Sequence, residues 1–288
     1  MLEGAKAMSQ PGIDELAASL ERSRARRERA GRVAAIIYPI GVVLAVLAVW
    51  EGATRLLGVP AFLLPPPSAV AISLVANAHL IVSHGWITTL EILLGFALSI
   101  AVGIPLALAI FLWPLFSRSI LPLLISSQAM PKVAVAPLLL VWFGFGLLPK
   151  VLIAFLIAFF PVVINTAVGL SAIEREKIYL ARSMGFGAAA TFFKIRLPNA
   201  LPAIFGGLKI SITLAVVGAV VGEFVGGDAG LGYLLMVANG SMDTQLLFAG
   251  IIALTVLGVA LFLLVELAER IFVPRHIITS GKVAGEAF

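Results

Sequence analysis

Lys132 and Glu223 are charged residues that stand inside long apolar stretches of the sequence, and Gln128 lies one helical turn before Lys132. A charge at the centre of a membrane helix costs about 3 kcal/mol on insertion scales unless water or a partner compensates it. Such residues often mark a solvated path, and a flexible ammonium is suited to attracting an anion. We predict that these three residues line a path for a polar solute. A purely structural ion pair is the alternative interpretation.

The sequence has few residues of the types that catalysis or metal binding needs. It contains no cysteine, which excludes disulfides, thiolate metal sites and a cysteine nucleophile. The three histidines, His79, His84 and His276, are too scattered for a histidine-rich metal site. The glycine-rich segment 226–232 lacks the Gly-Lys-Ser/Thr that a phosphate-binding loop requires, and no Walker A pattern occurs elsewhere. We therefore predict no catalytic, cofactor-binding or metal-binding residues.

The composition is that of a membrane protein. Of the 288 residues, 61% are hydrophobic and only 12% are charged, and the mean hydropathy is +1.10. A soluble domain of this length does not need so much apolar surface. The net charge of +5 does not indicate nucleic-acid binding, because the basic residues gather before the first apolar stretch, in one central loop and after the last stretch. This distribution follows the positive-inside rule.

We expect an all-α protein with six membrane-spanning helices and both ends in the cytoplasm. A helix of about 20 residues crosses the hydrocarbon core. The domains are a cytoplasmic tail at 1–32, a transmembrane domain at 33–273 and a second cytoplasmic tail at 274–288. The expected spans are 33–57, 86–111, 119–143, 151–172, 203–225 and 246–267. In the fifth span, small residues recur at helical spacing up to Glu223, which predicts close helix packing and a protein or water environment for that carboxylate.

The segment 173–202 is a charged loop between two apolar stretches. A short amphipathic helix is expected to end before Gly185, because glycine readily adopts the positive φ that follows many helix ends. A second short helix, 188–194, carries Phe192 and Phe193 and is expected to end before Pro198. Two short helices at an angle would form a knuckle on the membrane surface, a shape suited to docking another protein. An ordinary basic loop is the alternative.

This loop resembles that of the inner-membrane permease subunits of bacterial ABC importers. Their pattern is Glu-Ala-Ala, three residues, Gly, nine residues, Ile, one residue, Leu-Pro. The sequence matches the spacing throughout but has Tyr179 and Leu180 in place of the first two letters. Segments 136–146 and 226–233 are also similar to signatures of the branch that handles nitrate, sulfonates, taurine and pyrimidine precursors. The resemblance covers about residues 35 to 275 and assigns these residues to ATPase coupling: Ala181, Arg182, Gly185, Phe192, Ile195, Leu197 and Pro198.

The resemblance implies that the chain is a permease subunit and not an enzyme. It would lie in the bacterial inner membrane and translocate a small polar solute of the nitrate, sulfonate, taurine or pyrimidine-precursor class. Its implied partners are cytoplasmic ATPase subunits that bind ATP, a second permease copy in a homodimer, and an extracytoplasmic solute-binding protein. Two alternatives are an ion-coupled secondary transporter, which would be expected to show inverted repeats, and a membrane-embedded enzyme, which would need a Ser/His pair or a metal cluster.

Overall fold

The computed structural model describes residues 38–273, which belong to two compact units divided between Ala69 and Val70. The tails predicted at 1–32 and 274–288 lie outside the described residues. In the first unit, helix Tyr38–Leu56 is followed by a turn that folds back on the helix. The Glu51 carboxylate accepts the Ser68 backbone N–H at 3.0 Å and the Ser68 hydroxyl at 2.8 Å. These bonds hold the first turn of the helix that follows the Pro-rich turn.

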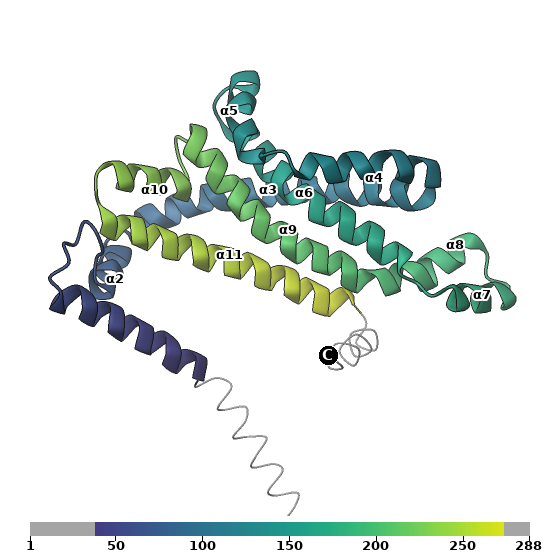
Figure 1. Ribbon diagram of the computed structural model, residues 1–288, viewed down its shortest axis with the longest axis horizontal. Helices are drawn as coiled ribbons and strands as arrows, with labels where there is room; N and C mark the ends of the chain where they lie inside the picture. Colours follow the sequence, from purple (N-terminus) through teal and green to yellow (C-terminus); the bar gives the residue numbers. More distant parts are fainter. Residues whose placement is uncertain (1–37, 274–288) are drawn as a thin grey trace, which may run out of the picture. The chain divides into compact units, whose positions relative to one another are not determined.

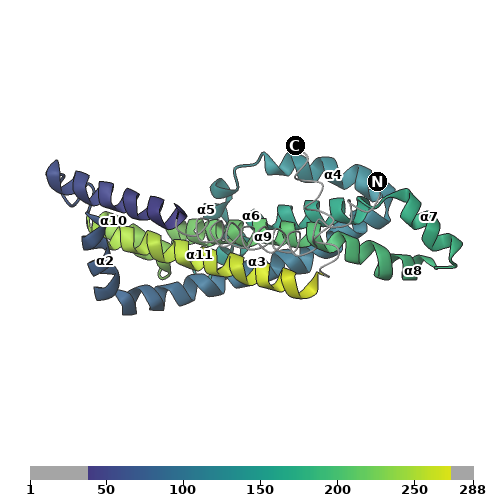
Figure 2. The ribbon, with the colours of Figure 1, turned by 90° about the horizontal axis from the view of Figure 1, so that it is seen from below.

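The second unit is built from helices (Figure 1), and the regular structure assigned within residues 38–273 is entirely helical, as the sequence predicts. Four long helices, α3, α6, α9 and α11, run side by side, while α7 and α8 project at one end and α10 lies at the other (Figures 1 and 2). The elements are α2 (Pro67–Ala76), α3 (Ala78–Leu112), α4 (Pro114–Gln128), α5 (Lys132–Phe143), α6 (Leu147–Ser171), α7 (Arg175–Ser183), α8 (Ala188–Thr191), α9 (Leu197–Gly226), α10 (Leu231–Gly240) and α11 (Thr244–Phe272).

The centre of the second unit is the contact of α6 with α9 and α3, which are the two most extensive helix–helix contacts. A Cβ added to Gly218 of α9 would lie 2.6 Å from Cα of Ala154, and one added to Gly95 of α3 would lie 2.6 Å from Cβ of the same residue. The Ser211 hydroxyl donates to the Ala158 carbonyl at 2.7 Å. Small residues therefore let three backbones approach closely, and the predicted packing role of the small residues in α9 is confirmed.

Five helices among the described residues are long and apolar enough to span a membrane, and α4 with α5 makes a sixth if this bent pair is one span. The third predicted span is therefore broken, with a bend of 95° between its halves. Pro131 lies in the break and lacks a backbone N–H, so the helix cannot continue through it without losing a hydrogen bond. Lys132 is the first residue of α5 and lies directly after this bend.

The helices extend beyond the predicted bounds. The helix α3 begins at Ala78 instead of Trp86, because the polar residues before Trp86 are compatible with a helix and no breaker separates them. The short helices α2 and α10 were not predicted, since runs of about ten apolar residues do not distinguish a helix from a loop. In the described part of the chain, α2 and α10 are the only apolar helices of 10–17 residues that do not belong to a candidate span.

The prediction that Pro198 ends the second loop helix is wrong. After α8 the chain forms a π-helical turn at Phe192–Arg196, which leads directly into α9 at Leu197. Pro198 stands in the first turn of α9, where a missing N–H is well tolerated. In the π-helical turn before it, each N–H bonds to the carbonyl five residues earlier instead of four. Thus 188–226 is one continuous helical stretch that joins the charged loop directly to the fifth span.

Candidate functional site

The loop between α6 and α9 folds as a knuckle around Gly185. The backbone of Gly185 has φ +81°, and its N–H donates to the Arg182 carbonyl at 3.0 Å. The Phe186 N–H donates to the Ala181 carbonyl at 3.0 Å. This pair of bonds is the Schellman arrangement that ends helices with a left-handed residue. The predicted helix end at Gly185 and its positive φ are confirmed.

The knuckle presents apolar side chains to solvent. Leu180, Met184 and Phe193 are 63%, 66% and 65% exposed, whereas Ala181 is buried. A folded loop that anchors one residue and exposes large apolar neighbours has a surface suited to a protein partner. Arg182 is exposed and lines a surface groove of about 400 Å³ together with other residues of α3, α7, α8 and the π-helical turn.

The base of the knuckle is fixed to the spanning helices by aromatic and cationic contacts. The guanidinium carbon of Arg196 lies 4.9 Å from the centre of the Phe111 ring, and Arg196 donates to the Leu170 carbonyl at 3.4 Å. The Phe192 ring lies 6.4 Å from that of Phe111. A displacement of the knuckle would therefore be transmitted to α3 and α6. The other predicted coupling residues, Ile195, Leu197 and Pro198, are half-buried at this base.

At the opposite end of the second unit, α3 and α6 contribute a buried ion pair. The Lys150 ammonium lies 3.0 Å from Oε1 of Glu91, and the side chains are 3% and 0% exposed. Within residues 38–273, neither oxygen of Glu91 accepts a hydrogen bond of good geometry. The charge of Lys150 is therefore the main compensation for burying the Glu91 carboxylate. Removing one partner of such a pair leaves an uncompensated buried charge.

Glu223 of α9 completes this buried cluster. It is 0% exposed, and its Oε1 accepts the Thr88 hydroxyl at 2.7 Å while its Oε2 accepts the Gly232 N–H. Lys150 and Glu91 are close enough to interact with it electrostatically. A Cβ on Gly232 would lie 2.7 Å from Oε2, so the backbone of α10 reaches the carboxylate only because glycine stands there.

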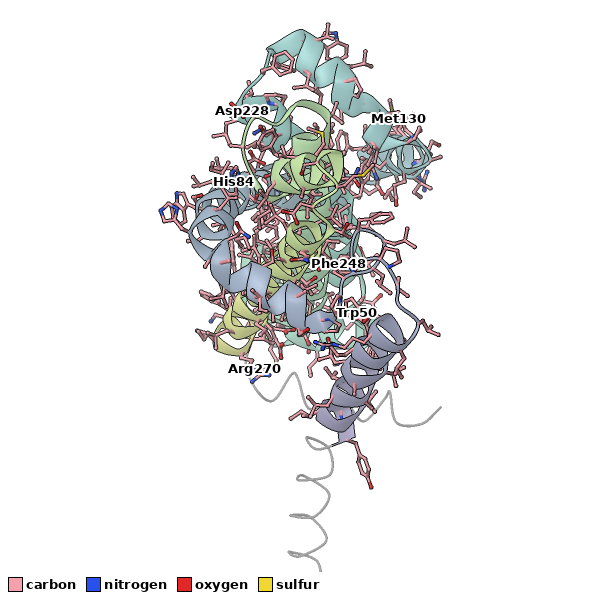
Figure 3. All side chains as sticks on the ribbon, turned by 90° about the vertical axis from the view of Figure 1, so that its left-hand side faces the viewer. Trp50, His84, Met130, Asp228, Phe248 and Arg270 are labelled. Atoms are coloured by element: carbon pink, nitrogen blue, oxygen red, sulfur yellow. The ribbon has the colours of Figure 1, made fainter. Side chains whose placement is uncertain are left out.

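Asp228 joins the buried cluster to the surface. Its Oδ1 lies 3.3 Å from the Lys150 ammonium although its own side chain is 86% exposed. Its own backbone N–H and the Lys150 ammonium lower the pKa of Asp228 below the usual range for an aspartate. Lys150 also donates to the Ala229 carbonyl at 3.3 Å. Figure 3 shows the unit from the end that carries α10, with Asp228 and His84 labelled beside each other.

The predicted path residues do not form one constellation. Within residues 38–273, no ion pair joins Lys132 to Glu223; the Lys132 ammonium lies over the Phe160 ring, 4.5 Å from its centre. Gln128 is the exposed last residue of α4, on the other side of the bend. The assignment of these residues to a path stays a prediction, and Glu223 belongs to a hydrogen-bonded cluster.

The sequence reasoning missed Lys150 and Thr88 and left Glu91 without a role. A signal was available, because Lys150 and Glu91 are both ionisable residues inside or at the edge of apolar stretches. Each should have been treated as a functional candidate with a partner. Thr88 carried no such signal, since isolated threonines are common in membrane helices and usually bond their own backbone.

The sequence matches a known family over much of its length. The profile of the binding-protein-dependent transport system inner membrane component family matches residues 99–277, more than half of the chain. This range includes the knuckle, Lys150 and Glu223.

Curated relatives match nearly their full length. The chain is 39% identical to the riboflavin transport system permease protein RibX of Chloroflexus aurantiacus, over 83% of this chain and 90% of RibX. It is 35% identical to the formylaminopyrimidine transport permease protein ThiX of Halalkalibacterium halodurans, over 83% of this chain and 95% of ThiX. It is 28% identical to the taurine transport system permease protein TauC of Escherichia coli, over 84% of this chain and 90% of TauC.

The fold is also similar to that of a solved transporter. A chain from the inward-facing structures of the MetNI methionine ABC transporter aligns with a TM-score of 0.61 and 17% identity, covering 69% of this chain and 99% of that one. At this identity the similarity supports the fold.

Proposed function

This chain belongs to the family of binding-protein-dependent transport system inner membrane components, as the permease subunit of an ABC importer, and we propose that it carries a small heterocyclic solute. Two of its relatives, at 39% and 35% identity, are named for riboflavin and for formylaminopyrimidine, which both contain a pyrimidine-type ring. The relative named for taurine is less similar, at 28% identity. These names favour a pyrimidine-containing nutrient over a sulfonate.

The observation that carries the coupling part of the proposal is the knuckle around Gly185. It exposes apolar side chains while its base contacts α3 and α6. A partner that binds the knuckle and moves would therefore also move these spanning helices. We propose that this partner is a cytoplasmic ATPase subunit that binds and hydrolyses ATP. Of the residues assigned to coupling, Arg182 and Gly185 are exposed and would touch this partner, whereas Ala181 is buried and Phe192, Ile195, Leu197 and Pro198 are half-buried at the base.

The knuckle sets the proposed orientation of the chain. If it faces the cytoplasm, the loop 227–230 and α10 lie toward the extracytoplasmic side, where a solute-binding protein would dock. Both tails would then be cytoplasmic. We further propose that two copies of this chain form the permease, which leaves each copy to supply one knuckle to one ATPase subunit.

Lys132 is the strongest remaining candidate for the solute path. It follows the bend between α4 and α5, and its ammonium lies against the face of Phe160. A cation over an aromatic ring beside a break in a helix can contact an anionic solute through its charge or an aromatic solute through the ring. Gln128, the last residue of α4 on the other side of the bend, would supply a neutral hydrogen-bonding group on the approach. Glu223 would act indirectly through the cluster around it.

The experiment that tests this function is reconstitution into proteoliposomes. The chain would be combined with its ATPase and solute-binding protein partners, and ATP-dependent uptake of a labelled pyrimidine and of labelled taurine would be compared. We expect uptake of the pyrimidine and none without ATP. Uptake of taurine alone would contradict the substrate class, and uptake driven by an ion gradient without the ATPase would contradict the importer function.

A further inference from the structure

Thr88 of α3 forms hydrogen bonds with residues of two other helices, α9 and α10. Its hydroxyl donates to Oε1 of Glu223 at 2.7 Å and accepts the Leu231 N–H at 2.7 Å. It also lies 3.2 Å from the His84 carbonyl. Because a hydroxyl has a single proton, the shorter contact to Glu223 is the one that receives it. Thr88 is 0% exposed, so its partners are fixed by the protein and not by water.

The other N-terminal amides of α10 are held in the same way. Gly230 N–H donates to Nδ1 of His84 at 3.0 Å, and Gly232 N–H donates to the Glu223 carboxylate. The first amides of a helix have no acceptor within the helix, and leaving them unpaired in a membrane protein is costly. Three consecutive amides, those of the N-cap residue Gly230 and of the first two residues of α10, thus depend on side chains of α3 and α9. This polar tie is separate from the apolar packing of α10, which is more extensive on α11 than on α3.

We propose that Thr88 is a positioning residue of the transport cycle, whose hydroxyl ties α10 to α3 while the end of the permease next to loop 227–230 is closed. This inference rests on the proposed function. When that end opens, α10 moves with α11 and the bond from Leu231 to Thr88 breaks. The hydroxyl is neutral, so its release leaves no unpaired charge. The exposed Asp228 leaves Lys150 for water in the same step.

The chain offers a matched set of variants for this inference. Thr88→Val removes the hydroxyl and keeps the shape of the side chain, while Thr88→Ser restores the hydroxyl. Thr89→Val is the control, because the Thr89 hydroxyl donates to the Gly85 carbonyl of its own helix at 2.6 Å. The fully assembled transporter in lipid nanodiscs is assayed for ATPase activity with and without the solute-binding protein, and for hydrogen exchange of the amides at 230–232.

The loss of the tie should favour the open state. For Thr88→Val we expect basal ATPase activity and amide exchange at 230–232 to rise by a factor of about 2 to 12, the range that corresponds to one net hydrogen bond. Stimulation by the binding protein should fall by a similar factor. Thr88→Ser and Thr89→Val should behave as wild type. Unchanged basal activity and exchange in Thr88→Val, or a loss of activity that serine does not restore, would overturn the proposal.

A measurement on the wild type keeps the test valid if Thr88→Val does not assemble. Trapping with ATP and vanadate should speed exchange at 230–232 relative to the nucleotide-free transporter, while amides in the middle of α6 and α9 stay protected. Equal exchange in the two states would rule out release of α10. A wild-type chain that binds no ATPase subunit would instead contradict the proposed function. Binding of the ATPase subunit to the wild type is therefore measured before any variant is tested.

Discussion

The ammonium of Lys150 in α6 lies 3.0 Å from a carboxylate oxygen of Glu91 in α3, and both side chains are sealed from solvent. Two further carboxylates, those of Glu223 and Asp228, interact with the same ammonium. The Lys150 ammonium therefore interacts with carboxylates from α3, from α9 and from the loop 227–230, at the end of the unit that carries α10. Its position explains how an ionisable group on each of α3 and α9 can be buried together.

Lys150→Met should be the most destabilising change in this cluster. Methionine is similar in length to lysine but carries no charge, so Glu91 would be left unpaired. Breaking a buried ion pair lowers the free energy of unfolding by about 3 to 5 kcal/mol. Glu91→Gln should cost less, because Lys150 keeps Asp228. The double variant Glu91→Gln/Lys150→Met should recover part of the loss. Thermal unfolding of the purified permease would measure these changes.

A suitable control is Lys177→Met, which removes an exposed pair with Glu174 at 3.2 Å and should cost less than about 1 kcal/mol. Equal unfolding temperatures for Lys150→Met and Lys177→Met would show that the buried pair is not needed for stability.

Gly185→Val should disrupt the knuckle without affecting membrane insertion. A Cβ at Gly185 would meet no atom within 4 Å, so the strain comes from the backbone φ of +81° alone. Valine is strongly disfavoured there, whereas asparagine tolerates this region. Gly185→Val should weaken ATPase binding and abolish uptake, and Gly185→Asn should retain most of both. Co-purification of the ATPase subunit measures the effect; normal binding by the valine variant would exclude a coupling role.

The orientation of the chain can be tested with single cysteines, since the sequence contains none. A cysteine at the exposed Ser241, after α10, should react with an impermeant thiol reagent from the periplasmic side. A cysteine at the exposed Ser183, on the knuckle, should react only after the inner membrane is permeabilised. The reverse pattern would overturn the proposed topology.

Lys132→Met should separate a transport role from a structural one. The change removes the cation over Phe160 but keeps an apolar stem at the start of α5. We expect normal expression and ATPase binding with uptake reduced at least tenfold, because an interaction with the solute is lost. Lys132→Arg keeps the cation and should retain most uptake. A lowered unfolding temperature that accounts for the loss of uptake would favour a structural role for Lys132.

Gly218→Ala should destabilise the permease, whereas Gly206→Ala in the same helix should not. The new Cβ at position 218 would lie 2.6 Å from Cα of Ala154, a backbone atom that cannot move alone, while position 206 is open. Overpacking typically costs about 1 to 3 kcal/mol, and alanine in an open helical site favours the helix by up to about 1 kcal/mol. Opposite shifts in the unfolding temperature are expected; a similar shift at both sites would mean that the contact of α6 with α9 is loose.

The spans of this protein could be predicted because the bilayer restricts the amino-acid composition of any helix that crosses it. A helix that crosses lipid needs a long apolar sequence wherever it packs, so six apolar spans were recognisable without any contact information, although the break in the third was not predicted. The Schellman end at Gly185 was also predictable, since it depends on residues that are adjacent in the chain. The continuous helix from the knuckle into α9 was not predicted. From sequence alone, Pro198 indicates a helix end, because the π-helical turn that precedes it cannot be recognised.

The buried cluster was decided by the tertiary structure alone. The periodic small residues of the fifth span predicted that Glu223 faces protein or water. Whether Glu91, Lys150 and Glu223 meet one another depends on how three helices are rotated about their axes, and the sequence shows no such periodicity around Glu91 or Lys150. Close packing at Ala154 fixes the three helices, and only then do Thr88 and the first amides of α10 meet the Glu223 carboxylate. The sequence by itself determined a helical membrane protein with a helix end at Gly185 in its central charged loop, and the packing determined which of its charges act together.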